Sequence, residues 1–205
     1  MLRGLYAITD ATLTPEPELL IKVSAALRGG ARIIQYRDKS RDAPTRLRQA
    51  RALTALCHRF QRPLIINDDP ELALACDAAG VHLGQGDTDL TRARALLGKN
   101  ALIGITCHDS LELALQAQQQ GADYVAFGAF FPSTSKPGAR AAPLALLQQA
   151  RQRLHVPIVA IGGIRVDNAP QIITQGAAMV AVIQDLFAAT DVEERARQLT
   201  GLFDI

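Results

Sequence analysis

The chain has 205 residues, a length that fits one domain, and 48% of these residues are hydrophobic, which is enough for a sizeable core. That hydrophobic content, together with 20% charged residues, excludes a disordered chain. Lysine and arginine number 22 against 20 aspartates and glutamates, and this near balance, with only 4% aromatic residues, argues against a nucleic-acid partner.

In chain order, short apolar runs alternate with longer amphipathic stretches. Most of these runs are continuously hydrophobic, which is typical of parallel strands buried on both faces. The expected strands are residues 5–9, 32–37, 63–67, 80–83, 101–106, 123–128, 157–161 and 179–183. Helical patterns include residues 17–28, 44–60, 110–120, 143–154 and 192–202.

About eight strand–helix units in 205 residues predict a single-domain α/β fold, a (β/α)₈ TIM barrel that spans residues 1–205. Periodicity alone does not show that the sheet closes, so a doubly wound open sheet is the alternative. No glycine-rich dinucleotide motif follows the first expected strand, which counts against that alternative.

No segment of the sequence suggests a leader or a membrane span. The N-terminus leads directly into a strand-like segment, and no apolar run approaches the roughly 20 residues of a membrane helix. Cys57, Cys76 and Cys107 are odd in number and widely spaced, so they match neither a metal site nor a disulfide framework. We therefore expect free thiols and a cytoplasmic protein without membrane contact.

Polar residues collect at the ends of the expected strands, where a TIM barrel carries its active site. Gln35, Arg37 and Lys39 alternate along the second strand, so a continuing strand would point all three toward one face. If that face is the barrel interior, an anionic ligand or acidic residues must compensate the two cations. In the alternative reading, Lys39 lies in a loop and Arg37 pairs with Asp38 or Asp10.

Aspartates follow the third and fourth strands. Asp68 and Asp87 could meet at the barrel rim, and Mg²⁺ typically binds one or two carboxylates together with phosphate oxygens. The alternative is helix N-capping, which we prefer for Asp69 alone.

Two further segments suggest phosphate binding. The stretch 128–140 predicts a long loop over the barrel mouth that carries three hydroxyl groups and an ammonium group, at Ser133, Thr134, Ser135 and Lys136. Gly162 and Gly163 follow the seventh strand, and Ile183 and Gln184 end the eighth, where barrels frequently bind phosphate through backbone N–H groups.

The four histidines do not define a site by themselves. We expect His58 and His155 at the surface and His82 as a packed core residue, and we assign no role to His108.

These motifs together resemble the thiamine phosphate synthase family over nearly the whole chain. The resemblance rests on residues 5–10 (LYAITD), 35–39 (QYRDK), 66–69 (INDD), 82–87 (HLGQGD), 104–106 (GIT), 131–136 (FPSTSK) and 160–164 (AIGGI). It implies a TIM-barrel transferase of thiamine biosynthesis. The enzyme would use Mg²⁺ to join a hydroxymethylpyrimidine diphosphate to a thiazole phosphate, plain or carboxylated, and release pyrophosphate.

The resemblance also implies roles for individual residues. The catalytic residues would be Thr106, Lys136 and Arg37, and the metal ligands Asp68 and Asp87. The pyrimidine diphosphate would be bound by Gln35, Tyr36, Arg37, Asp38, Lys39, Asn67, Thr106 and Lys136. The thiazole phosphate would be bound by Ser133, Thr134, Ser135, Gly163, Ile183 and Gln184. Gln184 departs from the family pattern, in which Ser is common, so the expected contact there is made by the backbone.

Other functions of the same fold stay open at this point. A thiazole tautomerase of the same superfamily would share the phosphate loops but would not need the full set of Arg37, Lys39, Asp68, Asp87 and Lys136. Another phosphate-binding barrel isomerase would need a matched general acid and base, and the sequence offers no convincing pair. A non-catalytic regulator that binds thiamine precursors is the third alternative. The sequence does not determine the oligomeric state.

Overall fold

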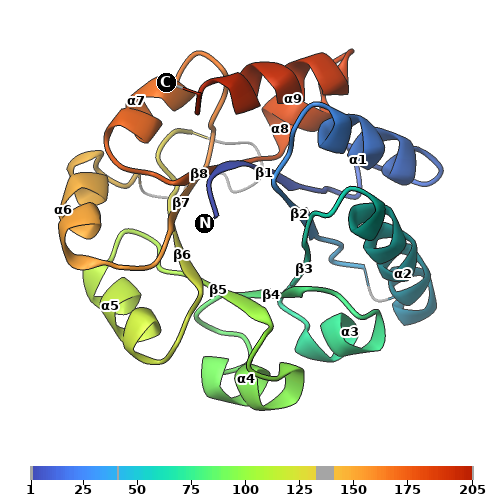
Figure 1. Cartoon of the computed structure of the whole chain (residues 1–205), viewed down its shortest axis with the longest axis horizontal. Helices are drawn as coiled ribbons and strands as arrows, with labels where there is room; N and C mark the ends of the chain where they lie inside the picture. Colours follow the sequence, from blue (N-terminus) through green and yellow to red (C-terminus); the bar gives the residue numbers. More distant parts are fainter. Residues whose placement is uncertain (1, 41, 133–140, 205) are drawn as a thin grey trace.

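The computed structural model of the protein describes residues 2–40, 42–132 and 141–204. Eight parallel strands pair in chain order, and β8 pairs with β1 to close the sheet into a barrel (Figure 1). The helices surround this ring of strands. The predicted barrel is therefore confirmed, and closure excludes the open doubly wound sheet.

The strands lie within a residue or two of the predicted ranges. They are β1 (Gly4–Ile8), β2 (Ile33–Tyr36), β3 (Leu64–Asn67), β4 (Gly80–Leu83), β5 (Leu102–Thr106), β6 (Tyr124–Phe127), β7 (Ile158–Ile161) and β8 (Met179–Val182). One difference matters for the site, because β2 ends at Tyr36 and does not continue through Arg37.

Helices follow every strand. They are α1 (Glu18–Arg28), α2 (Ala43–Arg59), α3 (Pro70–Ala75), α4 (Leu90–Leu97), α5 (Leu111–Gln119), α6 (Ala145–Arg153), α7 (Ala169–Thr174), α8 (Gln184–Phe187) and α9 (Val192–Gly201). Several begin at a side chain that accepts a hydrogen bond from a first-turn amide, which is the usual N-cap arrangement. These caps are Asp42, Asp69, Asp89, Ser110 and Asp191.

Two separate cores result from the alternation of side chains along each strand. One residue set points outward and packs beneath the helices, as Leu5, Ile34 and Phe127 do. The other set fills the barrel. It consists of Tyr6, Ile8, Ile33, Ile65, Tyr124, Ala126, Val159, Met179 and Ala181. Both sets are hydrophobic, which explains why the sequence shows continuous apolar runs.

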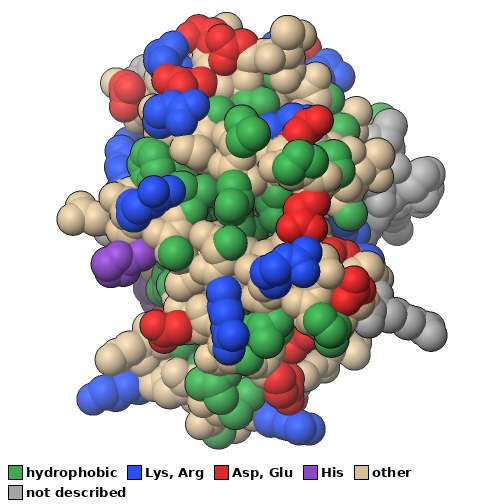
Figure 2. Space-filling view, turned by 90° about the vertical axis from the view of Figure 1, so that its right-hand side faces the viewer, with side chains coloured by type: hydrophobic (Ala, Val, Ile, Leu, Met, Phe, Trp, Pro, Cys, Tyr) green, Lys and Arg blue, Asp and Glu red, His purple; other side chains and the backbone are tan. Residues whose placement is uncertain are grey.

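The outer surface near α1 and α2 mixes hydrophobic side chains with charges of both signs (Figure 2). Leu20 and Ile21 of α1 are 41% and 67% exposed, and they border a shallow groove between α1 and α2. None of the helices in the described ranges combines the length and apolar character that a membrane span requires.

Candidate active site

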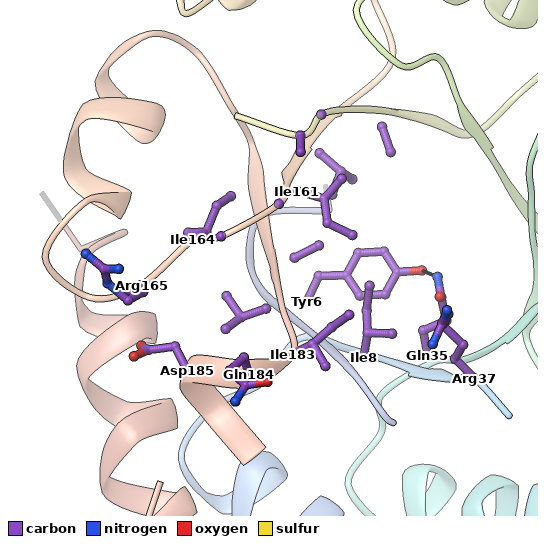
Figure 3. Close-up of a pocket in the computed structure, with 18 of the residues that line it drawn as sticks. Tyr6, Ile8, Gln35, Arg37, Ile161, Ile164, Arg165, Ile183, Gln184 and Asp185 are labelled. Carbon is purple, nitrogen blue, oxygen red and sulfur yellow. Dashed lines mark hydrogen bonds between the residues drawn. The ribbon is translucent and has the colours of Figure 1, made fainter. Parts of the chain in front are cut away.

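A cavity of about 600 Å³ lies at the carboxyl ends of the strands. Its walls come from strand ends and from the loops that follow them, which is where TIM barrels bind their ligands. The predicted site residues that line it are Gln35, Arg37, Asn67, Thr106, Gly163, Ile183 and Gln184. In Figure 3, Gln35 and Arg37 lie on one side of the cavity, and Gln184 and Asp185 lie on the other.

A chain of hydrogen bonds crosses the interior of the barrel beneath this cavity. The Gln35 amide nitrogen donates to the Tyr6 hydroxyl at 2.8 Å (Figure 3), and the Tyr6 and Tyr124 hydroxyls are 2.8 Å apart. The Tyr124 hydroxyl lies 3.1 Å from His82 Nδ1, and His82 Nε2 lies 2.8 Å from the Thr106 hydroxyl. Two predicted site residues, Gln35 and Thr106, are thus connected through three residues to which the sequence analysis gave no function.

The three connecting side chains are held by close packing. The Tyr6 and Tyr124 rings meet edge to face, with centroids 5.9 Å apart, and His82 stacks on Tyr124 at 5.6 Å. Burial is the main cause that raises the pKa of both phenols, so both keep their protons at neutral pH. The expectation that His82 is buried is correct, since it is 9% exposed, but it also lines the cavity.

The two cations after β2 are arranged as in the alternative reading. Arg37 Nη1 lies 3.6 Å from an Asp10 carboxylate oxygen, and the Arg37 backbone N–H donates to the Thr9 hydroxyl. Lys39 is exposed in the loop, because β2 has already ended. The prediction that Gln35, Arg37 and Lys39 share a strand face is therefore wrong beyond Gln35. Arg37 still lines the cavity and Lys39 does not, although the charge of Lys39 acts on Asp68.

Asp68 and Asp87 are close neighbours, as predicted for a metal site. Burial raises the pKa of Asp68, and the hydrogen bond and charge of Asp87 raise it further, while Lys39 lowers it. Asp87 also accepts a 2.6 Å hydrogen bond from the Gly84 backbone. Asp68 has φ = +62°, a conformation that Asp and Asn tolerate better than most residues.

Two facing carboxylates repel each other, and a divalent cation between them would remove that repulsion. No group of three or more His, Cys, Asp or Glu side chains gathers around one point in the described part of the chain. A pair is nevertheless sufficient for Mg²⁺, which commonly takes one or two carboxylates and completes its shell with phosphate oxygens and water. The donors therefore fit this ion. Asp69, by contrast, caps α3, as we expected, and it also pairs with Arg46.

The loop after β7 packs closely against the end of the loop segment at Phe131 and Pro132. Gly163 has φ = +61°, and a Cβ atom there would lie 2.3 Å from the Pro132 carbonyl oxygen. Asn168 fixes the loop from behind, since it accepts a 2.8 Å hydrogen bond from the Arg165 N–H and donates to the Gly163 carbonyl at 3.0 Å. Asp185 accepts from the Val166 N–H and pairs with Arg195 at 2.6 Å.

Some predicted residues lie elsewhere. Tyr36 points outward from β2 and donates to Gln49 of α2, and Asp38 accepts from the Ser40 N–H; neither lines the cavity. The predicted loop residues Ser133, Thr134, Ser135 and Lys136 fall outside the described residues.

The structure places Cys107 and His108, which follow Thr106, in different environments. Cys107 is fully buried in the outer core, so it has no access to the cavity. His108 lines the cavity mouth, although we assigned it no role.

Comparisons with known proteins agree with this geometry. The family model described as thiamine monophosphate synthase matches residues 5–186. The thiamine-phosphate synthase of Thioalkalivibrio sulfidiphilus is 55% identical over 204 residues, which cover 100% of this chain and 97% of that protein. The enzyme of the same name from Alcanivorax borkumensis is 52% identical over 98% of this chain and 94% of its own length. The structure of thiamine phosphate pyrophosphorylase from Pyrococcus furiosus superposes with a TM-score of 0.89 at 35% identity, covering 98% of this chain and 95% of that one.

Proposed function

The chain belongs to the thiamine monophosphate synthase family, and we propose that its cavity joins 4-amino-2-methyl-5-hydroxymethylpyrimidine diphosphate to thiazole phosphate. The products would be thiamine phosphate and pyrophosphate. One observation carries the proposal: a single cavity combines a polar floor with Arg37 and the glycine loop after β7. The paired carboxylates Asp68 and Asp87 follow β3 and β4, whose residues Asn67 and His82 line the same cavity. A pyrimidine, a phosphate and a magnesium diphosphate need these three kinds of surface.

The pyrimidine would lie on the floor of the cavity. Gln35 would bind the aminopyrimidine ring, and Thr106 would lie close to the reacting methylene. Asn67, at the end of β3, lines the same wall and would contact the diphosphate. Tyr36 and Asp38 lie outside the cavity, so the proposal gives them no direct contact with the substrate.

The diphosphate would be neutralised from two sides. Arg37 and Lys39 supply positive charge from the loop after β2, and Lys136 would add a third cation from a segment outside the described residues. Asp68 and Asp87 would hold Mg²⁺. When bound, this ion supplies charge neutralisation for the diphosphate oxygens.

The thiazole phosphate would bind at the opposite side of the cavity mouth. Gly163, Ile183 and Gln184 line this end, where their backbone N–H groups would bind the phosphate. Ser133, Thr134 and Ser135, which lie outside the described residues, would add hydroxyl contacts.

The reaction itself requires little acid–base chemistry. The bond between the methylene carbon and the diphosphate oxygen breaks, and its electron pair leaves with pyrophosphate. The electron-rich aminopyrimidine stabilises the resulting cationic methylene, and the thiazole nitrogen lone pair forms the new carbon–nitrogen bond. Positioning the two substrates and neutralising the leaving group are therefore the main tasks of Gln35, Thr106 and Arg37.

We further propose a location and a domain organisation for the protein. The free, buried state of Cys57, Cys76 and Cys107 suits a reducing compartment, so we assign the protein to the cytoplasm. We also treat residues 1–205 as one catalytic domain.

The test is pyrophosphate release with both substrates present, with and without Mg²⁺, together with mass-spectrometric detection of thiamine phosphate. Metal-dependent release that requires both substrates, with that product, supports the proposal. Tight binding without product, under conditions in which a relative with known activity works, would instead favour a tautomerase or a precursor-binding regulator. Running the assay with plain and carboxylated thiazole phosphate identifies the second substrate.

A further inference from the structure

We propose that Tyr6, Tyr124 and His82 are positioning residues that force the cavity to present a hydrogen-bond acceptor at Gln35 and a donor at Thr106. The five side chains form one continuous chain of hydrogen bonds, from the Gln35 amide to the Thr106 hydroxyl. The substrate preference that follows rests on the proposed function, whereas the direction of these hydrogen bonds does not.

The direction of each hydrogen bond follows from the first one. The Gln35 amide nitrogen can only donate, so the Tyr6 oxygen accepts from it. The Tyr6 O–H then has the Tyr124 oxygen as its partner at 2.8 Å. A buried hydroxyl hydrogen without a partner is costly, so Tyr6 donates to Tyr124, and Tyr124 in turn donates to His82 Nδ1.

The far end of the chain is fixed in the same way. A neutral imidazole whose Nδ1 accepts carries its proton on Nε2, so His82 donates to the Thr106 oxygen at 2.8 Å. The Thr106 O–H is then directed away from His82 and is available to the cavity that Thr106 lines. At the near end, the Gln35 amide turns its oxygen, an acceptor, away from Tyr6.

The two ends cannot change independently. If the Gln35 amide turned over, its oxygen would have to accept from Tyr6, and every later hydrogen bond would reverse. His82 would then carry its proton on Nδ1, and the Thr106 O–H would point to Nε2 instead of the cavity. The phenols reinforce this coupling because burial keeps both of them protonated.

The resulting pattern selects a class of ligand. An aminopyrimidine offers amine N–H donors and ring-nitrogen acceptors, so it can donate to the Gln35 oxygen and accept from the Thr106 hydroxyl. An oxopyrimidine, in which a carbonyl replaces the amine, would meet the Gln35 oxygen with another acceptor. The linked hydrogen bonds therefore make the cavity select the amino form. Binding the oxo form would require the Gln35 amide to turn over, and the Thr106 hydroxyl would then no longer donate into the cavity.

The polarity is tested on the substrate-free protein by ¹⁵N NMR of the two ring nitrogens of His82. We expect one tautomer, protonated on Nε2, in the wild type, and loss of this single tautomer in Tyr124→Phe, which removes the donor to Nδ1. Tyr36→Phe removes a buried phenol from the outer face of β2 and should leave the His82 signals unchanged. Protonation on Nδ1 in the wild type, or an unchanged tautomer in Tyr124→Phe, would overturn the proposal.

The ligand choice is tested by equilibrium binding of the aminopyrimidine diphosphate and its 4-oxo analogue. We expect the wild type to prefer the amino form by about 100-fold, and Tyr124→Phe to reduce this ratio by about tenfold. If Tyr124→Phe does not fold, Tyr6→Phe interrupts the same series of hydrogen bonds by removing the one between Tyr6 and Tyr124. Equal weakening of both ligands would show a merely structural role. If the tautomer is as expected but neither pyrimidine binds, the proposed function fails and the chain polarity stands.

Discussion

Gly104 of β5 lies directly against the ring of Tyr124. A Cβ atom at position 104 would stand 2.0 Å from the ring carbon Cζ and 2.5 Å from the phenol oxygen. Tyr124 is fully buried and is the central link between Tyr6 and His82. A residue without a side chain at position 104 is therefore what allows this phenol to cross the barrel interior beneath the cavity.

We accordingly expect Gly104→Ala to lower both stability and activity. The Tyr124 ring is enclosed on all sides, so it cannot move away without disturbing the inner core, and such overpacking typically costs about 1–3 kcal/mol. Thermal unfolding and kcat/KM for the pyrimidine diphosphate measure the two effects. Gly201→Ala is the control, because nothing lies within 4 Å of a Cβ atom there. An unchanged unfolding temperature in Gly104→Ala would contradict the packing argument.

The sequence predicted the barrel and the location of the site because both depend on local patterns. Continuous apolar runs mark parallel strands, and the polar residues after them mark the carboxyl edge of the sheet. Gln35, Asn67 and Thr106 end up in one cavity for this reason. Lys39 was misplaced because a strand's last residue is set by its partner strand, and β2 pairs with β3 only as far as Tyr36.

The residues that the sequence analysis missed depend on closure of the sheet. Tyr6 and Tyr124 are 118 positions apart, and nothing local shows that both point into the barrel. Their strands are hydrophobic on both faces, so the alternation that would reveal the inward set is hidden. No local pattern predicts the role of Asn168, since its hydrogen bond to the Gly163 carbonyl depends on how the loop folds back.

We expect Asp68→Asn to stabilise the metal-free protein while removing Mg²⁺-dependent activity. The pKa of Asp68 is raised in the folded protein, so its contribution to stability is present when it is protonated and is lost as the pH rises through that pKa. Above that pKa the ionised carboxylate is thus a cost to stability. Asparagine removes the charge and tolerates φ = +62°. Because the group is only partly buried, the gain should be about 1–2 °C in Tm.

The pH and the metal separate this effect from a general change in packing. Below the pKa of Asp68 in the unfolded chain, both variants are uncharged at position 68, so the difference in Tm should vanish. At pH 7, added Mg²⁺ should raise the Tm of the wild type and leave Asp68→Asn unchanged. A Tm difference that persists at low pH, or an equal response of both proteins to Mg²⁺, would argue against a carboxylate pair that binds the ion.

Cys57 and Cys107 should resist alkylation in the folded protein. Burial raises the pKa of each thiol to about 12, so almost no thiolate forms at pH 8, and the thiolate is the reactive species. Iodoacetamide labelling followed by mass spectrometry checks this, with the protein in urea as the positive control. Rapid labelling of the native protein at pH 8 would contradict the assigned burial.

Asn168→Ala should weaken the thiazole phosphate site selectively. Asn168 holds the loop after β7 through the Arg165 N–H and the Gly163 carbonyl, and Gly163 is the residue we propose for the phosphate. Loosening this loop should raise KM for thiazole phosphate by about tenfold, because small misplacements of a binding group are costly. KM for the pyrimidine diphosphate should stay within about twofold, since Gln35 and Arg37 lie on the other side of the cavity (Figure 3).

Asn168→Asp provides the matched variant for this last prediction. The aspartate keeps an acceptor for the Arg165 N–H but loses the donor to the Gly163 carbonyl, so its effect on KM should equal that of Asn168→Ala if the second hydrogen bond matters most. Recovery of the wild-type KM would assign the role to the Arg165 contact instead. Thermal unfolding of both variants measures how much stability each loses with its hydrogen bonds, so that this loss can be separated from the change in KM. A rise in both KM values together would mean that Asn168 supports the whole barrel mouth, and the separation of two substrate ends would then be wrong.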